Sequence, residues 1–267
     1  MSIPVETIQT DSFSMRYFRF GSGNKTFVIL PGLSIQSVMG SADAVAESYA
    51  SFAEEYTVFL FDRREDPPER YSVYDMGRDT AAAMKELGLR DVDLFGASQG
   101  GMLALVIAIE YPELVHKMVL GSSSAHVGPQ QYAVLQKWVR MAEEKDREGL
   151  YLEFGKELYP PELFEQSRDL LLSMAQSVTD EDLRRFIILA KGTEGFDVVS
   201  DLEKISCPVM AVGVFEDAVL DSDATMEIAE KLDERGDFKL YMYIGYGHAA
   251  FDTAPDYKDR ILSFFRS

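Results

Sequence analysis

A serine hydroxyl stands among glycines in the middle of an apolar run, in the segment LFGASQGGMLALVIA at residues 94–108. Residues 96–100 read Gly-x-Ser-x-Gly around Ser98, the pattern of a serine nucleophile on a sharp turn. The pattern alone is weak, since ordinary glycine and serine frequencies produce it by accident in about one chain of this length in ten. Its setting is more informative. The apolar segment DVDLF precedes it and the helix-like segment GMLALVIAIEY follows, so Ser98 lies at a predicted strand–turn–helix junction.

A phosphate-binding loop and a purely structural turn are the alternatives at this position. The segment contains neither the eight-residue P-loop pattern nor Gly-x-Gly-x-x-Gly, and no Lys follows its glycines. A structural turn would not need three glycines around one serine. We therefore take Ser98 as the candidate nucleophile, with small residues at 96 and 100 because the two backbones must approach closely there.

A serine nucleophile needs a neighbouring base to accept its proton, and the chain has three histidines. His248 lies in YIGYGHAAFDTAP, where small residues after a predicted strand leave the imidazole room to project over the sheet edge. His116 opens another predicted strand and is expected to be structural or exposed. His126 follows that strand, where a solvated loop residue is the alternative to a substrate-pocket residue. We predict His248 as the base and keep His126 as a candidate pocket residue.

The third group should be a carboxylate that fixes the tautomer of the imidazole and stabilises the imidazolium. The segment VGVFEDAVLDSD offers Glu216, Asp217, Asp221 and Asp223 after a predicted strand. We choose Asp217, because it falls a few residues past the strand end. Asp221 is better explained as part of a cap for the following helix, and Glu216 stays open. The order Ser98, Asp217, His248 then follows the chain.

A tetrahedral intermediate needs backbone N–H donors for its oxyanion. One predicted donor is Gln99, directly after the candidate nucleophile at a helix N-terminus. The other is Leu33, in the turn Pro31-Gly32-Leu33-Ser34 after the predicted strand TFVIL. A plain strand-ending Pro-Gly turn is the alternative reading. Ser34, in the same turn, is a candidate pocket residue.

The elements that must position these groups alternate between strand and helix. Predicted strands cover residues 12–21, 25–32, 56–62, 91–96, 116–123, 207–216 and 238–245, and Gly-Ser-Gly-Asn at 21–24 predicts a hairpin turn after the first. Predicted helices cover about 40–54, 73–89, 98–110, 222–234 and 253–266. This alternation indicates an α/β fold with a mainly parallel sheet covered on both faces.

Residues 129–200 break the alternation with four consecutive predicted helices at 130–146, 147–158, 161–176 and 180–191. Such a block is typical of a lid over the carboxyl ends of the strands, where open sheets bind ligands. We therefore divide the chain into a core domain, 1–125 and 201–267, and a helical cap, 126–200. Trp138 and Phe154 of the cap are candidate pocket residues. The alternative to a lid is a helical subdomain that only adds stability. The alternative for the two aromatic side chains is that they belong to the core of these helices.

Composition excludes several classes of function. The formal net charge of −19 argues against nucleic-acid binding and weighs against anionic membranes and anionic substrates. The single cysteine, Cys207, cannot form an intramolecular disulfide, and no zinc-type Cys/His spacing occurs, so no metal site is expected. The N-terminus lacks a signal-peptide pattern, and no apolar run reaches the roughly 18–20 residues that span a bilayer. We expect a cytoplasmic protein without a membrane association.

Together these segments resemble the α/β-hydrolase superfamily with a helical cap. LPGLS, FDRRE, LFGASQGG, CPVMAVGVFED and YGHAAFDTAP follow the family order along nearly the whole chain. The resemblance implies an eight-stranded, mostly parallel sheet, an acyl-enzyme on Ser98 and no metal or organic cofactor. The chain departs from many members before the oxyanion turn, where it has Leu30-Pro31-Gly32 in place of His-Gly, and at residues 62–67, where DRREDP replaces a Gly-x-Gly. We expect Arg63 and Arg64 to pair with the neighbouring Asp62, Glu65 or Asp66 rather than with substrate.

The sequence therefore predicts a serine hydrolase that cleaves a small or medium neutral carboxylic ester or thioester through an acyl-enzyme. Its partner is a small molecule, and the protein is a monomer or a homodimer. The same three groups also serve carbon–carbon bond hydrolases, acyltransferases and cofactor-free peroxidases. A ligand-binding, receptor-like protein with little turnover is the alternative of another class.

Overall fold

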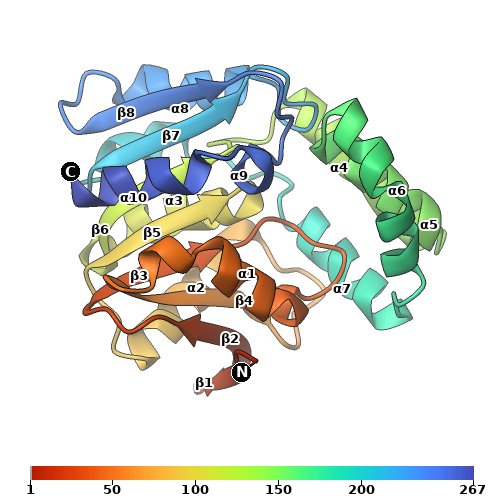
Figure 1. Ribbon diagram of the computed structural model, residues 1–267, viewed down its shortest axis with the longest axis horizontal. Coiled ribbons are helices and arrows are strands. Elements are labelled where there is room, and N and C mark those ends of the chain that lie inside the picture. Colours follow the sequence, from red (N-terminus) through yellow and green to blue (C-terminus); the bar gives the residue numbers. More distant parts are fainter. Residues whose placement is uncertain (1) are drawn as a thin grey trace.

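The computed structural model describes residues 2–267, and an eight-stranded sheet with helices on both faces forms its centre (Figure 1). The strands are β1 (Val5–Gln9), β2 (Ser14–Phe20), β3 (Lys25–Leu30), β4 (Tyr56–Arg64), β5 (Val92–Ala97), β6 (Val115–Gly121), β7 (Val209–Val214) and β8 (Phe238–Tyr243). Their order in the sheet is β1-β2-β4-β3-β5-β6-β7-β8. The pairs β1–β2 and β2–β4 are antiparallel, and every pair from β4 to β8 is parallel. The prediction of a mostly parallel, eight-stranded α/β fold is confirmed.

The amino-terminal strands differ from the sequence prediction in two ways. Strand β1 was not predicted, because it is an edge strand whose residues are exposed or half-buried and so carry little hydrophobic pattern. The turn at 21–24 is not a hairpin, since it joins β2 to β3 and these strands do not pair. Strand β4 lies between them, with Phe18 of β2 opposite Leu60 and Phe27 of β3 opposite Val58. A local turn signal cannot tell which strand will become the neighbour.

The helices follow the predicted order with small differences at their ends. They are α1 (Ala42–Ser48), α2 (Val73–Glu86), α3 (Gln99–Glu110), α4 (Pro129–Glu143), α5 (Arg147–Leu158), α6 (Pro161–Ala175), α7 (Asp180–Lys191), α8 (Asp223–Leu232), α9 (Ala250–Thr253) and α10 (Tyr257–Arg266). Short 3-10 turns are η1 (Val38–Ser41), η2 (Ala50–Phe52), η3 (Pro112–Leu114) and η4 (Val199–Lys204). The helix expected at 253–266 begins only at Tyr257 as α10, and the short α9, which was not predicted, ends before it because Ala254 before Pro255 is extended.

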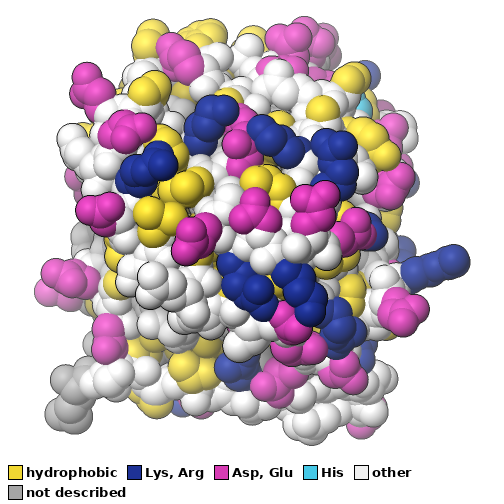
Figure 2. Space-filling model, turned by 90° about the vertical axis from the view of Figure 1, so that its right-hand side faces the viewer, with side chains coloured by type: hydrophobic (Ala, Val, Ile, Leu, Met, Phe, Trp, Pro, Cys, Tyr) yellow, Lys and Arg dark blue, Asp and Glu magenta, His cyan; other side chains and the backbone are white. Residues whose placement is uncertain are grey.

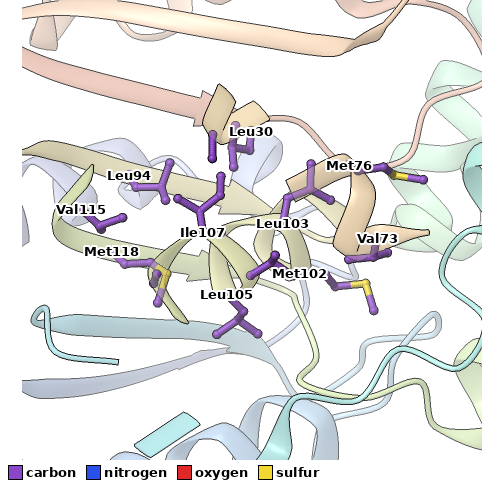
Figure 3. Packing of buried hydrophobic residues seen from close by; sticks show 14 of the residues in the cluster. Leu30, Val73, Met76, Leu94, Met102, Leu103, Leu105, Ile107, Val115 and Met118 are labelled. Carbon is purple, nitrogen blue, oxygen red and sulfur yellow. The ribbon is translucent and has the colours of Figure 1, made fainter. Parts of the chain in front are cut away.

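Helix α3 is buried around nearly its whole circumference, which explains why its sequence is apolar without a polar face. Residues 99–108 are all buried. Figure 3 shows Leu103 and Ile107 among Leu30 of β3, Leu94 of β5 and other buried side chains. Each such leucine contributes roughly 1.5–3 kcal/mol to the free energy of unfolding when fully buried. This packing fixes the N-terminus of α3, and therefore Ser98, against the carboxyl ends of β3 and β5.

Helices α4 to α7 connect β6 to β7 and lie beyond the carboxyl ends of the strands (Figure 1). They pack on one another around a separate apolar cluster that includes Trp138 and Phe186. Ile35, Val219 and Leu220 from loops of the sheet complete this cluster. The outer face of the four helices, turned to the viewer in Figure 2, carries acidic and basic side chains interspersed with hydrophobic areas. One apolar side of these helices therefore faces the sheet edge, and the charged side faces outward.

The turn between β5 and α3 leaves no space for side chains at its two outer glycines. A Cβ on Gly96 would lie 2.4 Å from the carbonyl oxygen of Gly100, and one on Gly100 would lie 2.0 Å from the carbonyl oxygen of Leu30. Both distances are far below van der Waals contact with backbone atoms that cannot move aside. Strand β3, strand β5 and helix α3 therefore meet here through their backbones.

We expect Gly100→Ala to lower the free energy of unfolding by about 1–3 kcal/mol, because the added methyl group forces β3 and α3 apart. Urea denaturation of the purified variant measures this change. Gly236→Ala is the matched control, since a Cβ there would meet nothing within 4 Å and the backbone is not left-handed. Equal stability of the Gly100 and Gly236 variants would contradict the close packing of this turn.

Candidate active site

Ser98 occupies a strained position on the turn between β5 and α3. Its φ is 52° and its ψ −121°, a combination that non-glycine residues rarely adopt. The turn is held from both sides: the N–H of Ser98 donates to the Gly121 carbonyl over 2.8 Å, and the Ser123 hydroxyl donates to the Ser98 carbonyl over 2.9 Å. Ser98 is half-buried and lines a cavity.

His248 reaches Ser98 from the loop between β8 and α9. Its Nε2 lies 2.9 Å from the Ser98 Oγ, and the ring is 2% exposed. Gly247 has a φ of +64°, and a Cβ there would lie 2.9 Å from the carbonyl oxygen of Leu158 at the end of α5. The same carbonyl accepts a hydrogen bond from the N–H of Ala249 over 3.0 Å. Helix α5 therefore holds the loop that carries the imidazole.

Asp217 contacts the other side of the imidazole. Its Oδ1 and Oδ2 lie 2.9 and 2.8 Å from the Nδ1 of His248. The Oδ1 also accepts hydrogen bonds of 2.9 Å from the N–H groups of Val219 and Leu220, which fix the carboxylate. Because a carboxylate can only accept, the proton belongs on Nδ1, which leaves Nε2 free to accept from the Ser98 hydroxyl. The structure thus brings the three predicted side chains into one hydrogen-bonded chain.

The two other acidic candidates are engaged elsewhere. Glu216 accepts from the N–H of Gly245 over 2.8 Å. Asp221, one residue before the N-cap Ser222, accepts from the N–H of Asp223, the first residue of α8, over 2.8 Å. Among these neighbouring carboxylates, it is Asp217 that touches His248.

The predicted oxyanion donors flank Ser98. A Cβ on Gly32 would lie 3.2 Å from the Ser98 Cβ, so the turn that carries Leu33 passes directly beside Ser98. Gln99 is the first residue of α3, where a helix leaves its N–H groups without intrahelical partners. Within residues 2–267, neither the N–H of Leu33 nor that of Gln99 donates a hydrogen bond. Both groups are therefore available to a ligand atom near Ser98.

Arg63 braces the two segments that carry these donors, a role that the sequence did not predict. Its guanidinium donates to the Pro31 carbonyl over 2.8 Å and to the Gln99 Oε1 over 3.1 Å. Gln99 in turn donates from Nε2 to the Leu189 carbonyl of α7 over 2.8 Å. Burial lowers the pKa of Arg63 to about 10, so the group stays a cation at neutral pH. The expectation that Arg63 pairs with a neighbouring carboxylate side chain is wrong, because the side chain turns inward from β4.

Asp62 and Arg64 also find partners far away in the sequence. Asp62 forms a buried ion pair with Arg185 of α7, with 2.6 Å between Oδ1 and Nη2. The Nη1 of Arg64 lies 3.5 Å from the Oδ2 of Asp79 in α2. Its Nε donates a hydrogen bond to the backbone carbonyl of Asp66, not to the Asp66 carboxylate. The expected local ion pairs are therefore replaced by contacts that join β4 to α2 and α7.

A cavity of about 320 Å³ opens beside Ser98 and His248. Small-molecule sites typically measure about 300–1,000 Å³. Of the predicted pocket residues, Ser34, Trp138 and Phe154 line this cavity, as does Leu33. His126 does not, which corrects the prediction. The segment after β6 turns away, so that His126 pairs with Asp197 in a β-bridge and its Nδ1 lies 2.6 Å from Glu227.

Sequence reasoning missed several further lining residues, among them Leu158 and Asp252. Asp252 follows His248 by four residues, and this proximity to the candidate base was the one available signal. No cluster of three or more His, Cys, Asp or Glu suited to a metal ion occurs in the described part of the chain. From residue 2 to residue 267, no helix combines the length and the apolarity needed to cross a membrane.

Comparison with known proteins gives a consistent result. A family model described as the alpha/beta hydrolase fold matches residues 25–150. The chain is similar to 3-oxoadipate enol-lactonase 2 of Acinetobacter baylyi, with 20% identity over 80% of both chains. It is 28% identical to the serine hydrolase BPHL of Mus musculus over 54% of this chain and 53% of that protein. Among solved structures, MGS-M2, an alpha/beta hydrolase enzyme from a Medee basin deep-sea metagenome, superimposes with a TM-score of 0.87 at 22% identity over 98% of both chains.

We expect Arg185→Met to lower the free energy of unfolding by about 3–5 kcal/mol, because it leaves the buried Asp62 carboxylate without its counter-ion. Arg184→Met is the control, since Arg184 pairs on the surface with Glu181 and its loss should cost less than about 1 kcal/mol. Urea denaturation of both variants gives the comparison. A similar loss in the two proteins would show that the Asp62–Arg185 pair does not hold α7 to β4.

Proposed function

This chain belongs to the α/β-hydrolase superfamily and is a hydrolase, and we propose that it cleaves a small or medium carboxylic ester or thioester through an acyl-enzyme on Ser98. One observation carries the proposal: the hydrogen-bonded chain from the Ser98 hydroxyl through His248 to Asp217, placed at the wall of an apolar cavity. A serine hydroxyl becomes a useful nucleophile only with such an adjacent base.

The acylation step uses the proton positions that the hydrogen bonds favour. As the Ser98 Oγ attacks the ester carbonyl carbon, its proton passes to the Nε2 of His248, and the carbonyl electron pair moves onto the oxygen. Asp217 stabilises the imidazolium that forms without taking its proton. Collapse of the tetrahedral intermediate breaks the bond to the leaving alcohol or thiol, which takes the proton from His248. The acyl group remains on Ser98.

Deacylation repeats the sequence with water. His248 takes a proton from the water as its oxygen attacks the acyl carbon, and collapse returns the proton to Ser98 while the acid leaves. In both steps the N–H groups of Leu33 and Gln99 are the proposed donors to the oxyanion. Arg63 supports this role because it ties the Pro31 carbonyl and the Gln99 side chain together, which fixes the spacing of the two donors. Removing one such donor typically costs a factor of about 10²–10³ in kcat.

The cap of residues 126–200 is proposed to shape the substrate site. Trp138 and Phe154 form part of the apolar cavity wall, and the centroids of their rings are 4.5 Å apart. Trp138 is 2% exposed, so it is also a core residue of the cap. The relative named an enol-lactonase is consistent with an ester substrate, because a lactone is a cyclic ester. Carbon–carbon hydrolysis, acyl transfer and peroxidation use the same three groups, and a panel of acyl esters separates ester hydrolysis from them.

We expect Ser98→Ala to reduce hydrolysis of p-nitrophenyl acetate to the uncatalysed background, because among the described residues no other hydroxyl hydrogen-bonds to the His248 Nε2. A fluorophosphonate probe should label the wild-type protein and not the variant, and circular dichroism should show an unchanged fold. Undiminished turnover by the variant would refute Ser98 as nucleophile. Labelling of the wild-type protein without turnover of any ester would favour the receptor-like alternative.

We expect Asp217→Asn to lower kcat by about 10⁴-fold, because an amide cannot hold the His248 proton on Nδ1. Asp221→Asn, four residues later, should change kcat by less than about threefold, since Asp221 contacts the start of α8 and not the imidazole. Steady-state kinetics with p-nitrophenyl acetate measures both variants. The reverse ranking would mean that the wrong carboxylate has been assigned.

A further inference from the structure

Among the described residues that line the cavity, Asp252 is the one acidic side chain, and a neutral apolar ester does not account for it. It lies in α9, four residues after His248, and lines the cavity together with its neighbour Phe251. The surrounding wall is largely apolar and includes Val45, Leu60 and Phe95. The residue is exposed rather than buried, and it belongs to the cavity wall.

The Asp252 carboxylate has no hydrogen-bond or ion-pair partner among residues 2–267. Lys258 is the cation whose charge acts on this carboxylate, but its Nζ donates to the carbonyl oxygens of Phe251, over 2.6 Å, and Asp252, over 3.5 Å. The other titratable groups that sense its charge are the phenols of Tyr49, Tyr159 and Tyr257. The carboxylate therefore lies in the cavity without a cation of its own.

Keeping this carboxyl group in place works against folding at neutral pH. Desolvation raises its pKa above the ordinary value, and the charge of Lys258 offsets only part of this effect. A raised folded-state pKa means that the folded chain binds more protons than the unfolded chain as the pH rises from the ordinary carboxyl pKa. Its contribution to stability therefore falls with rising pH over that window and stays low above it. A ligand that pairs with the carboxylate would remove this penalty.

We propose that Asp252 binds an ammonium group of the substrate, so that the preferred esters are those of linear amino acids or amino alcohols. This inference rests on the proposed function and refines its substrate class. The apolar wall suits the methylene chain between the ester and the amine, and Asp252 supplies the counter-charge at the end of that chain. The net charge of −19 adds a field that attracts cations.

The test compares isosteric ester pairs that differ in one ammonium group. One pair is p-nitrophenyl 6-aminohexanoate and p-nitrophenyl heptanoate, and the other is 5-aminopentyl acetate and hexyl acetate. We expect the wild-type protein to show a higher kcat/KM for the amine than for the alkyl ester in at least one pair. Asp252→Asn should lower the ratio of these two kcat/KM values by about 10- to 100-fold. Asp259→Asn, which removes the same charge from the exposed side of α10, should leave the ratio within about twofold. A ratio that is unchanged in Asp252→Asn overturns the inference.

A binding measurement separates this inference from the proposed function. Calorimetry on Ser98→Ala, which needs no turnover, should show n-hexylammonium binding at least about 10-fold more tightly than 1-hexanol, with the difference lost when Asp252→Asn is added. In the wild-type protein, n-hexylammonium should inhibit ester hydrolysis competitively, with an inhibition constant lower than that of 1-hexanol. This measurement needs no substituted protein. Ser98-dependent hydrolysis with no preference for amines overturns the Asp252 inference alone. Asp252-dependent amine binding without hydrolysis of any ester supports this inference and overturns the proposed function.

Discussion

The positive φ of Ser98 is the constraint on which the rest of the site depends. A serine keeps this conformation only where its surroundings prevent relaxation, and here β3, β5 and α3 meet through their backbones at Gly96 and Gly100. The buried apolar surface of α3 presses the start of that helix into the contact. The strain of a single residue is thus balanced by the packing of the whole sheet centre, and the hydroxyl is held where a loop alone could not hold it.

The parallel sheet explains how groups distant in the sequence come to surround that hydroxyl. Parallel strands present their carboxyl ends at one edge, so the loops after β3, β5, β7 and β8 deliver Leu33, Ser98, Asp217 and His248 to the same place. Each loop is then fixed by its own contacts rather than by the sheet. The carboxylate of Asp217 is held by two backbone N–H groups, and the loop of His248 is held by the Leu158 carbonyl of α5. The helices above the sheet edge therefore help to position the side chains of the candidate site and also form part of the cavity wall.

The sequence predicts those features of the fold and of the candidate site that depend on short, local patterns of residues. The alternation of strands and helices, the turn at Ser98 and the small residues around His248 are local, and the structure places the predicted side chains in contact, although their catalytic roles stay predictions. The sequence failed where an answer depends on three-dimensional neighbours. Arg63 stands next to carboxylates in the sequence, yet the strand turns it toward the Pro31 carbonyl and Gln99. His126 sits at the start of the helical block, but its loop turns away from the cavity toward Glu227.

Arg63 and Asp252 are two charged side chains near the candidate site whose surroundings disfavour the charge, and they differ in their partners. The guanidinium of Arg63 is enclosed and has protein acceptors, so its charge serves the fold by holding two segments together. The carboxylate of Asp252 is more exposed than Arg63, although desolvation raises its pKa, and it has no donor from the described chain and lies at the cavity wall. A group that only stabilised the fold would be expected to carry partners, because an unpaired charge lowers stability. An unpaired carboxylate that faces a ligand-sized space is instead what binding requires, since the missing partner can then be supplied by the ligand.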